Sequence, residues 1–268
     1  MPRYNTATPD NLSLMFKAFR IFILLLIFAG IALGTWRAKI QAVEWKYELP
    51  VNIYLINGDD STAVAEYLRG LTIKDFKPIE TFMLDEAKRY GRASNASIEI
   101  RLGGKIETQP PEPPRNGSAL EVIAWSLKMR WWAYRNTDTV GSSTQVKMFL
   151  LYFDPVQRQR LGHSTGLQKG MIGRVNVFAS RDMAKQNNVI ITHEFLHTLG
   201  ATDKYDPATN QPFYPDGYAN PDLQPLHPQR FSEIMAGRTP LSQTEAVTPA
   251  SLDDALIGGK TAQEINWF

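Results

Sequence analysis

Two histidines four residues apart, in a strongly apolar segment, constrain this chain more than any other feature of its sequence. Residues 189–206 read VIITHEFLHTLGATDKYD, so His193 and His197 would project from one face of a helix, one turn apart. Two imidazoles at this spacing can reach one zinc ion at about 2.0–2.1 Å. Glu194 lies too far round the helix to join them, and can instead hydrogen-bond a water on the metal. The segment predicts a metal-binding helix that ends at Gly200; the alternative is a pair of structural histidines on a core helix.

A zinc ion that carries out hydrolysis needs a third protein ligand and one position left for water. Gly200 lets the chain turn sharply after the helix, and Asp203, three residues on, can then swing back toward the metal. The full string is H-E-x-x-H-x-x-G-x-x-D. We expect Asp203 to be the third ligand, the alternative being a turn or capping aspartate. The other candidate ligands are His227, His163 and, more remotely, Glu233.

This string resembles the signature of the metzincin clan of zinc metallopeptidases, H-E-x-x-H-x-x-G-x-x-H followed by a methionine turn. The aspartate in the last position is similar to the snapalysin-like variant of the clan. The methionine turn would be residues 232–237, S-E-I-M-A-G. The resemblance implies Zn²⁺ bound by His193, His197 and Asp203, Glu194 as the general base, and Met235 as an apolar floor under the histidines.

Strands that alternate with helices predict an α/β domain, of the α+β zincin-like kind, over residues 49–268. It would hold a twisted mixed sheet, an active-site helix and a C-terminal helical subdomain. Residues 160–168 could form a short edge strand, and the resemblance implies that this strand pairs with extended peptide. The expected strands are 51–56, 97–102, 146–153 and 172–178, and the expected helices are 61–70, 77–91 and 118–135.

Local patterns also predict where helices begin. Asn187 or Asn188 can cap the histidine-bearing helix. Two capping boxes or near relatives, Ser251-x-x-Asp254 and Thr261-x-x-Glu264, predict two further helices near the C-terminus.

The segment from Ile21 to Trp36 contains no charged residue. With its flanking residues it reaches the length that spans a bilayer. We expect a cytoplasmic tail (1–15), a single-pass transmembrane signal anchor (16–36) and a linker (37–48), with the catalytic domain outside the cell membrane. The alternatives are a cleaved signal peptide, which would make the protein secreted, and a buried core helix. The tryptophans of residues 118–135 are expected to pack on the sheet, or else to lie at a membrane surface.

Composition removes several classes of function. The chain has no cysteine, which excludes disulfides, thiolate nucleophiles and iron–sulfur clusters. Its net charge of +2, without a basic run, gives no support to a nucleic-acid partner. We therefore expect a membrane-anchored zinc endopeptidase that acts on peptides or proteins. The alternatives are a membrane-tethered zinc module for binding or assembly without turnover, and a hydrolase of cell-wall amides. Calcium bound by the aspartates of residues 203–222 is a weaker expectation than solvated turns.

Overall fold

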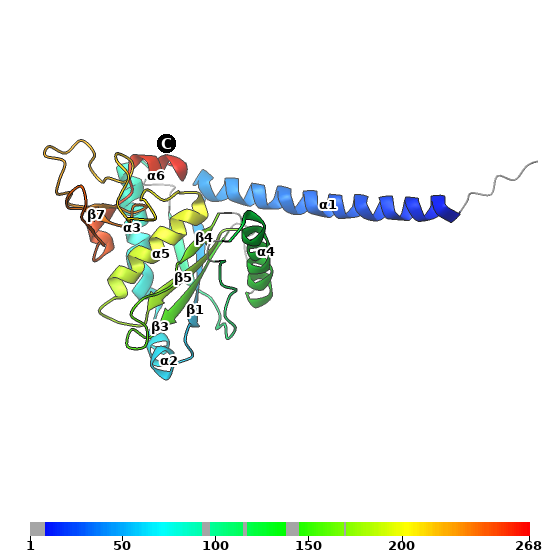
Figure 1. Ribbon diagram of the computed structural model, residues 1–268, viewed down its shortest axis with the longest axis horizontal. Helices are drawn as coiled ribbons and strands as arrows, with labels where there is room; N and C mark the ends of the chain where they lie inside the picture. The colour runs from blue at the N-terminus through cyan, green and yellow to red at the C-terminus, as the bar shows by residue number, and fades with distance from the viewer. Residues whose placement is uncertain (1–8, 93–96, 115–116, 138–144, 169) are drawn as a thin grey trace, which may run out of the picture.

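Five strands form a mixed sheet in the order β2-β1-β3-β5-β4 (Figure 1). The structure is a computed structural model that describes residues 9–92, 97–114, 117–137, 145–168 and 170–268. The first four strands in this order are parallel, whereas the edge strand β4 runs antiparallel to β5. The strands are β1 (Leu49–Asn57), β2 (Ile98–Leu102), β3 (Val146–Phe153), β4 (Thr165–Leu167) and β5 (Ile172–Phe178).

The central strand β3 explains why the sheet is covered on both faces. Its sequence, VKMFLLYF, is buried at every position but the second. Successive side chains point to opposite faces, so Met148 and Leu150 join one core cluster while Phe149 and Leu151 join the other. Apolar runs of this kind are typical of strands with helices on both sides. The predicted strand at residues 146–153 is confirmed.

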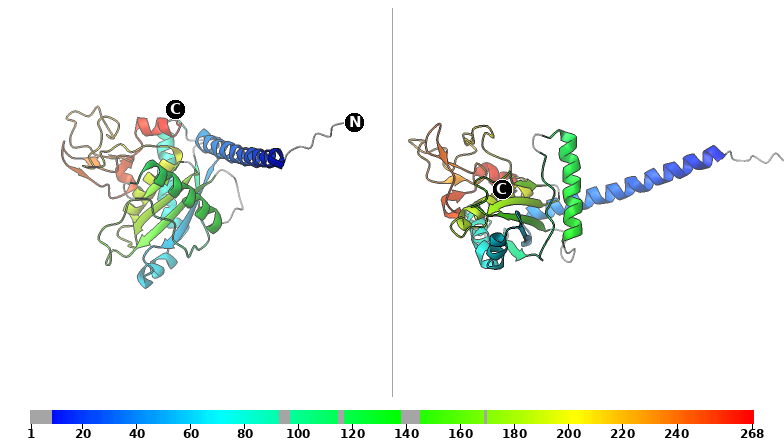
Figure 2. Two further views of the ribbon diagram at one scale, coloured as in Figure 1. Left: turned by 45° about the vertical axis from the view of Figure 1, so that its right-hand side comes forward. Right: turned by 60° about the horizontal axis from the view of Figure 1, so that its bottom comes forward.

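Helices cover both faces of this sheet (Figures 1 and 2). On one face, α5 packs Phe195 and Leu196 into the same core cluster as Val175 of β5. On the other face, α4 contributes Trp125 and Met129. The mixed α/β architecture predicted from the sequence is therefore confirmed. The helices of these layers are α2 (Thr62–Arg69), the 3₁₀ turn η1 (Ile73–Phe76), α3 (Lys77–Arg89), α4 (Ala119–Asn136) and α5 (Ala184–Leu199).

The start of α5 differs from its prediction. The helix begins at Ala184, after Met183, so Asn187 and Asn188 lie inside it and do not cap it. The Asn187 amide bonds the backbone of Phe178 at the end of β5, and the Asn188 amide donates to the Asp75 carbonyl at 3.0 Å. These two asparagines tie α5 to the end of β5 and to η1. A capping rule based on adjacent residues cannot predict such contacts.

The chain after α5 is largely irregular, and the predicted C-terminal helical subdomain is small. The Ser251 capping box is present and begins the 3₁₀ turn η2. The second box is wrong, because α6 begins at Gly259 with Gly258 as its N-cap, and Thr261 lies within the helix. The elements here are β6 (Ser232–Glu233), β7 (Thr239–Pro240), β8 (Ala246–Val247), η2 (Leu252–Asp254), β9 (Ala255–Leu256) and α6 (Gly259–Glu264).

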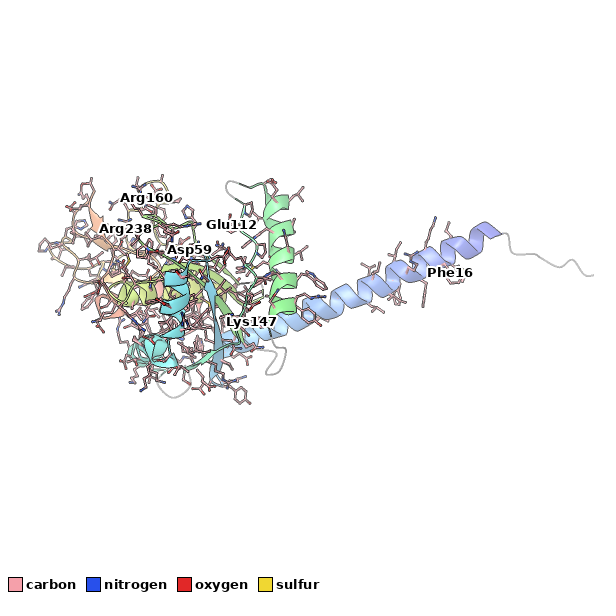
Figure 3. All side chains as sticks on the ribbon, turned by 90° about the horizontal axis from the view of Figure 1, so that it is seen from below. Phe16, Asp59, Glu112, Lys147, Arg160 and Arg238 are labelled. Carbon is pink, nitrogen blue, oxygen red and sulfur yellow. The ribbon has the colours of Figure 1, made fainter. Side chains whose placement is uncertain are left out.

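Helix α1 (Pro9–Glu44) projects away from the domain, and Phe16 lies far out along it (Figures 1 and 3). It continues through residues 37–44, where a linker was predicted, and Trp45 just beyond is buried against the C-terminal residues. Many apolar side chains between residues 14 and 26 are exposed. Within the described residues, none of the helices has the length and apolar character required to traverse a bilayer. The transmembrane anchor predicted for residues 16–36 therefore has no support from the structure, and residues 1–8 of the predicted tail lie outside the described residues.

Candidate metal centre

Three side chains converge at the C-terminal end of α5. The Nε2 atoms of His193 and His197 are 3.1 Å apart, and the carboxylate atom Oδ1 of Asp203 lies 3.1 Å from the first and 3.2 Å from the second. This group, which is the one metal-capable cluster found among the described residues, could hold a metal ion. The helix places the histidines, and Gly200 places the aspartate.

Gly200 ends α5 in the left-handed region, with a φ of 113°. Its amide and that of Ala201 bond carbonyls of the last helical turn. A side chain at position 200 would be strained at this φ, and glycine is not. The chain therefore reverses direction at once and brings Asp203 back over the histidines, as the sequence predicts.

Backbone carbonyls fix which nitrogen of each imidazole faces the cluster. His193 Nδ1 lies 2.9 Å from the carbonyl of Ile234, and His197 Nδ1 lies 2.8 Å from that of Ala201. A carbonyl can only accept a hydrogen bond, so both Nδ1 atoms carry the proton. Both Nε2 atoms then face Asp203, and in the neutral imidazole each presents the lone pair that a metal-ligating histidine needs.

Three electron-rich atoms this close together require a cation between them, either a proton or a metal ion. Burial lowers the pKa of His193, but its hydrogen bond with Asp203 and the charge of Glu194 outweigh burial and raise that pKa to about 9. Partial burial works to raise the pKa of Asp203, yet the hydrogen bonds from both histidines hold it well below its usual range. The cluster therefore favours a bound proton or metal ion.

Glu194 follows His193 on α5, and its side chain is not one of the three that converge. It is buried, and burial raises the pKa of its carboxyl against the opposing charges of His193 and His197. The backbone amide of Gly166 in β4 donates a hydrogen bond to the Glu194 carboxylate. Its Oε2 atom is buried and has no hydrogen-bond partner among the described residues. A buried carboxylate oxygen without a protein partner is uncommon, which makes Glu194 a candidate catalytic group.

The edge strand β4 passes directly over α5 at this point. A Cβ built on Gly166 would lie 2.4 Å from the Glu194 carbonyl oxygen and 2.5 Å from Cβ of His197. Only a glycine allows the strand to come this near. The edge strand expected at residues 160–168 is present but shorter, at residues 165–167, next to the catalytic candidate.

The segment predicted as a methionine turn contacts one candidate ligand and the residue after another through its backbone. The Ile234 carbonyl accepts from His193, and the Met235 carbonyl accepts from the Lys204 amide, next to Asp203. Met235 itself is fully buried in the main core. Gly237 closes the turn with a φ of 67°. The sequence pattern gave no indication of these carbonyl contacts.

Glu264 of α6 was missed by the sequence prediction, which made it a capping partner of Thr261. Its carboxylate accepts from the Thr202 amide at 2.9 Å and pairs with Lys204 at 2.7 Å. Lys204 is buried, so its charge depends on this partner. Glu264 therefore binds the residues on both sides of Asp203, an arrangement called here the Glu264 clamp.

Tyr205 lies beside the cluster, with its ring centroid 6.4 Å from that of His193. Burial and the nearby charge of Asp203 raise the pKa of its phenol to about 12, and its hydroxyl hydrogen-bonds that carboxylate. A small cavity of about 200 Å³ opens here between α5 and the turn at 234–237. Its wall includes Val189, His193, Tyr205 and Arg238.

The remaining candidates lie elsewhere in the fold. His227 packs against Tyr218, which in turn packs against Tyr214. His163 borders a separate cavity. Glu233 is fully buried and accepts from Thr261, as well as from two backbone amides. Of the aspartates weighed for calcium, Asp203 belongs to the histidine cluster and Asp206 caps its own turn by accepting from the Ala208 amide.

The sequence matches no family model and no curated protein. The chemistry of the site itself therefore carries the functional proposal.

Proposed function

We propose that this protein is a zinc-dependent endopeptidase of the metzincin type, in its snapalysin-like form. The observation that carries the proposal is the convergence of two histidines and an aspartate beside a buried glutamate oxygen that has no partner. Either feature alone has simpler explanations. Together they provide a cation site and a base within one turn of the same helix.

The donor set suits zinc. Ligands at about 2.0–2.1 Å from a tetrahedral zinc lie roughly 3.3 Å from one another. The three separations between the Nε2 and Oδ1 atoms, at 3.1–3.2 Å, come close to this value. Two neutral imidazoles and one carboxylate leave a fourth position open, as hydrolytic zinc sites require.

When bound, zinc would supply a Lewis acid that polarises the scissile carbonyl and makes water a stronger acid. Glu194 would accept the proton of the attacking water on Oε2 and deliver it to the leaving amine. The raised pKa of this carboxyl suits a group that must both take up and release a proton. The Gly166 amide keeps the carboxylate in place during both transfers.

The substrate would be an extended peptide paired with the outer edge of β4. Backbone hydrogen bonds to an edge strand bind peptides with little preference for sequence. A side chain of the peptide would enter the cavity beside His193. Membrane attachment through α1, with the catalytic domain outside, remains part of the proposal and rests on the uncharged sequence from Ile21 to Trp36.

The test is to replace Glu194 with glutamine in the full-length chain. Glu194→Gln should retain about one zinc per chain and lose about 10²- to 10⁴-fold in peptide hydrolysis, because it removes only the base. Elemental analysis gives the zinc content, and a mixed library of quenched fluorescent peptides gives the activity.

Three controls accompany this variant. Glu245→Gln changes an exposed glutamate and should match the wild type in both measurements. Asp203→Ala should lose zinc, whereas Asp222→Ala should not. Full hydrolysis by Glu194→Gln would overturn the peptidase proposal, and zinc retention without activity in the wild type would favour a binding or assembly module.

A further inference from the structure

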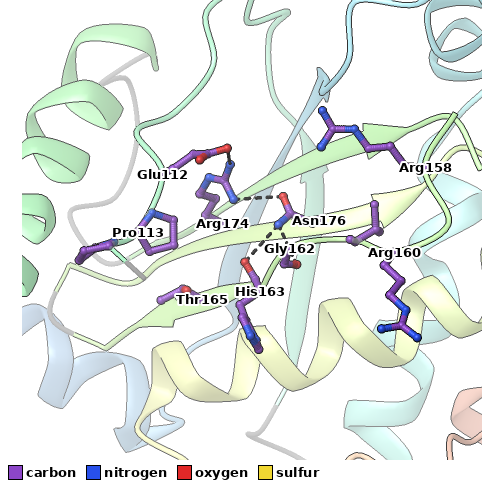
Figure 4. A pocket seen from close by; sticks show the side chains of 11 residues that line it. Glu112, Pro113, Arg158, Arg160, Gly162, His163, Thr165, Arg174 and Asn176 are labelled. Carbon is purple, nitrogen blue, oxygen red and sulfur yellow. Dashed lines mark hydrogen bonds and ion pairs between the residues drawn. The ribbon is translucent and has the colours of Figure 1, made fainter. Parts of the chain in front are cut away.

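A second cavity, of about 640 Å³, lies beside β4 and β5 (Figure 4). Gly166 of β4 faces α5 and its histidines, and the neighbouring Thr165, on the opposite face of the strand, lines this cavity. Its walls come from the proline-rich loop at residues 112–114, the loop at 158–163, β4 and β5. The described residues of its lining include three arginines, Arg158, Arg160 and Arg174, and one carboxylate, that of Glu112. The cavity therefore carries an excess of positive charge.

Arg174 is the buried cation of this cavity. Its side chain is 5% exposed. One guanidinium nitrogen donates to Oδ1 of Asn176 at 3.1 Å, while its Nε is buried and has no partner among the described residues. Arginine stays charged in proteins and offers five N–H donors. Among the described residues, Asn176 is the one close hydrogen-bond partner of this guanidinium, so several of its N–H groups are without a partner.

Glu112 neutralises this charge only in part. Its carboxylate lies 3.9 Å from the guanidinium, and its side chain is 79% exposed. An ion pair of that length with a solvated partner is weak. A buried charge without a close partner is unfavourable, so an anion in the cavity would be strongly stabilised.

Asn176 holds the guanidinium in a fixed orientation. Its amide nitrogen donates to the carbonyls of Gly162 and His163, at 3.0 and 3.1 Å. Its oxygen is therefore directed at Arg174 (Figure 4). A fixed planar fork of this kind matches the two oxygens of a carboxylate.

The position of the cavity indicates where that carboxylate comes from. Thr165 of β4 lines the cavity and pairs directly with Arg174, and the next residue, Gly166, bonds Glu194. Alternate side chains of a strand point to opposite faces, so a peptide added to β4 would direct every second side chain toward the face that carries this cavity. Such a peptide lies roughly 10 Å from β5, a gap that a glutamate and an arginine side chain can span together.

We propose that this cavity is a substrate subsite that binds an acidic side chain of the peptide, with Arg174 as its buried anchor. The inference rests on the proposed peptidase function. It predicts that the enzyme prefers glutamate or aspartate at one position near the scissile bond.

The experiment uses pairs of cleavable peptides with amidated C-termini, each pair having glutamate or glutamine at one position. Hydrolysis is measured with the full-length zinc-loaded chain, and binding by fluorescence anisotropy with its Glu194→Gln variant. At the responsive position, glutamate should improve binding and kcat/KM by about 10- to 100-fold over glutamine, as expected for hydrogen bonds to a charged group. Peptides with a free C-terminus form a separate arm, which tells a side-chain carboxylate from a terminal one.

Four variants test the role of the cavity. Arg174→Met should bring the glutamate-to-glutamine ratio close to 1, and Arg160→Met should lower it several-fold. Glu112→Gln should raise the ratio, because it removes the competing carboxylate. Both Arg160 and Glu112 are exposed, so these two variants should fold even if Arg174→Met does not. Arg69→Met, an exposed arginine on α2, should leave the ratio unchanged.

The subsite proposal would be overturned if the wild-type glutamate-to-glutamine ratio were near 1 at every position. It would also be overturned if both Glu112→Gln and Arg160→Met left the ratio unchanged. In either case hydrolysis itself would still support the peptidase proposal. A preference confined to peptides with a free C-terminus would also overturn the subsite proposal. The absence of any peptide hydrolysis or binding would overturn both proposals together.

Discussion

Each histidine of the metal cluster uses its two ring nitrogens for different purposes. Nδ1 is committed to a backbone carbonyl, and Nε2 faces Asp203. In the metal-free protein a proton between these groups provides the positive charge, and the pKa of about 9 at His193 reflects how strongly it is held. Metal and proton compete for the same position.

This competition predicts how the metal-free protein responds to pH. The pKa of His193 is raised above its unfolded value of about 6.5, so the proton contributes stability that is fully present below about pH 6.5. That contribution is lost as the pH rises through about 9. Urea unfolding of the chelated protein between pH 6 and 9.5 should show falling stability, at about 1.4 kcal/mol per unit of pKa difference.

The Asp203→Asn variant should flatten this pH dependence, because it removes the carboxylate that holds the proton. Zinc-loaded protein should lack the decline over the same range. A metal-free stability that stays constant from pH 6 to 9.5 would contradict the assignment.

At the scale of the element, β4 has only three residues but lies between the metal cluster and the basic cavity. Gly166 allows its close approach to α5. We predict that Gly166→Ala destabilises the protein by about 1–3 kcal/mol, the usual cost of forcing a methyl into a filled space. Hydrolysis should fall as well, since the strand that bonds Glu194 must move.

Urea unfolding and peptide hydrolysis check this prediction. The matched control is Gly104→Ala, where a new Cβ meets nothing within 4 Å, and it should change stability by less than about 0.5 kcal/mol. Equal behaviour of the two variants would show that β4 does not need its glycine.

Elements with a strong local pattern were predictable from the sequence, and those held by distant contacts were not. The strand at 146–153 and the helix end at Gly200 follow from hydrophobic runs and glycine geometry alone. Thr261 and Glu264 fit a capping pattern locally. Their actual partners, however, are Glu233 and Lys204, which lie 28 and 60 residues away in the chain. No rule that uses neighbouring residues can find such pairs.

At the scale of the whole molecule, the site depends on the C-terminal residues. Glu264 holds Thr202 and Lys204 on either side of Asp203, and Glu233 ties the turn at 234–237 to Gly258 and Thr261. The ligands come from α5 and the loop after it, but the position of that loop is set from α6.

We predict that Glu264→Gln weakens zinc binding about 10-fold, as the loss of an outer contact around a metal ligand commonly does. It should also destabilise the fold by about 3 kcal/mol, because it leaves the Lys204 ammonium buried and unpaired. Zinc titration against a competing chelator and urea unfolding measure the two effects. The double variant Lys204→Met/Glu264→Gln should regain stability, and its failure to do so would mean that the charge is not the cause.

The Glu264 clamp has a consequence for the timing of synthesis. Because a chain emerges from the ribosome in order, both histidines and Asp203 leave it well before Glu264, which follows Lys204 by sixty residues. An unfinished chain has all its metal ligands yet lacks the residue that fixes the third one in place. The proposed zinc site would therefore reach its full affinity only once synthesis has passed α6.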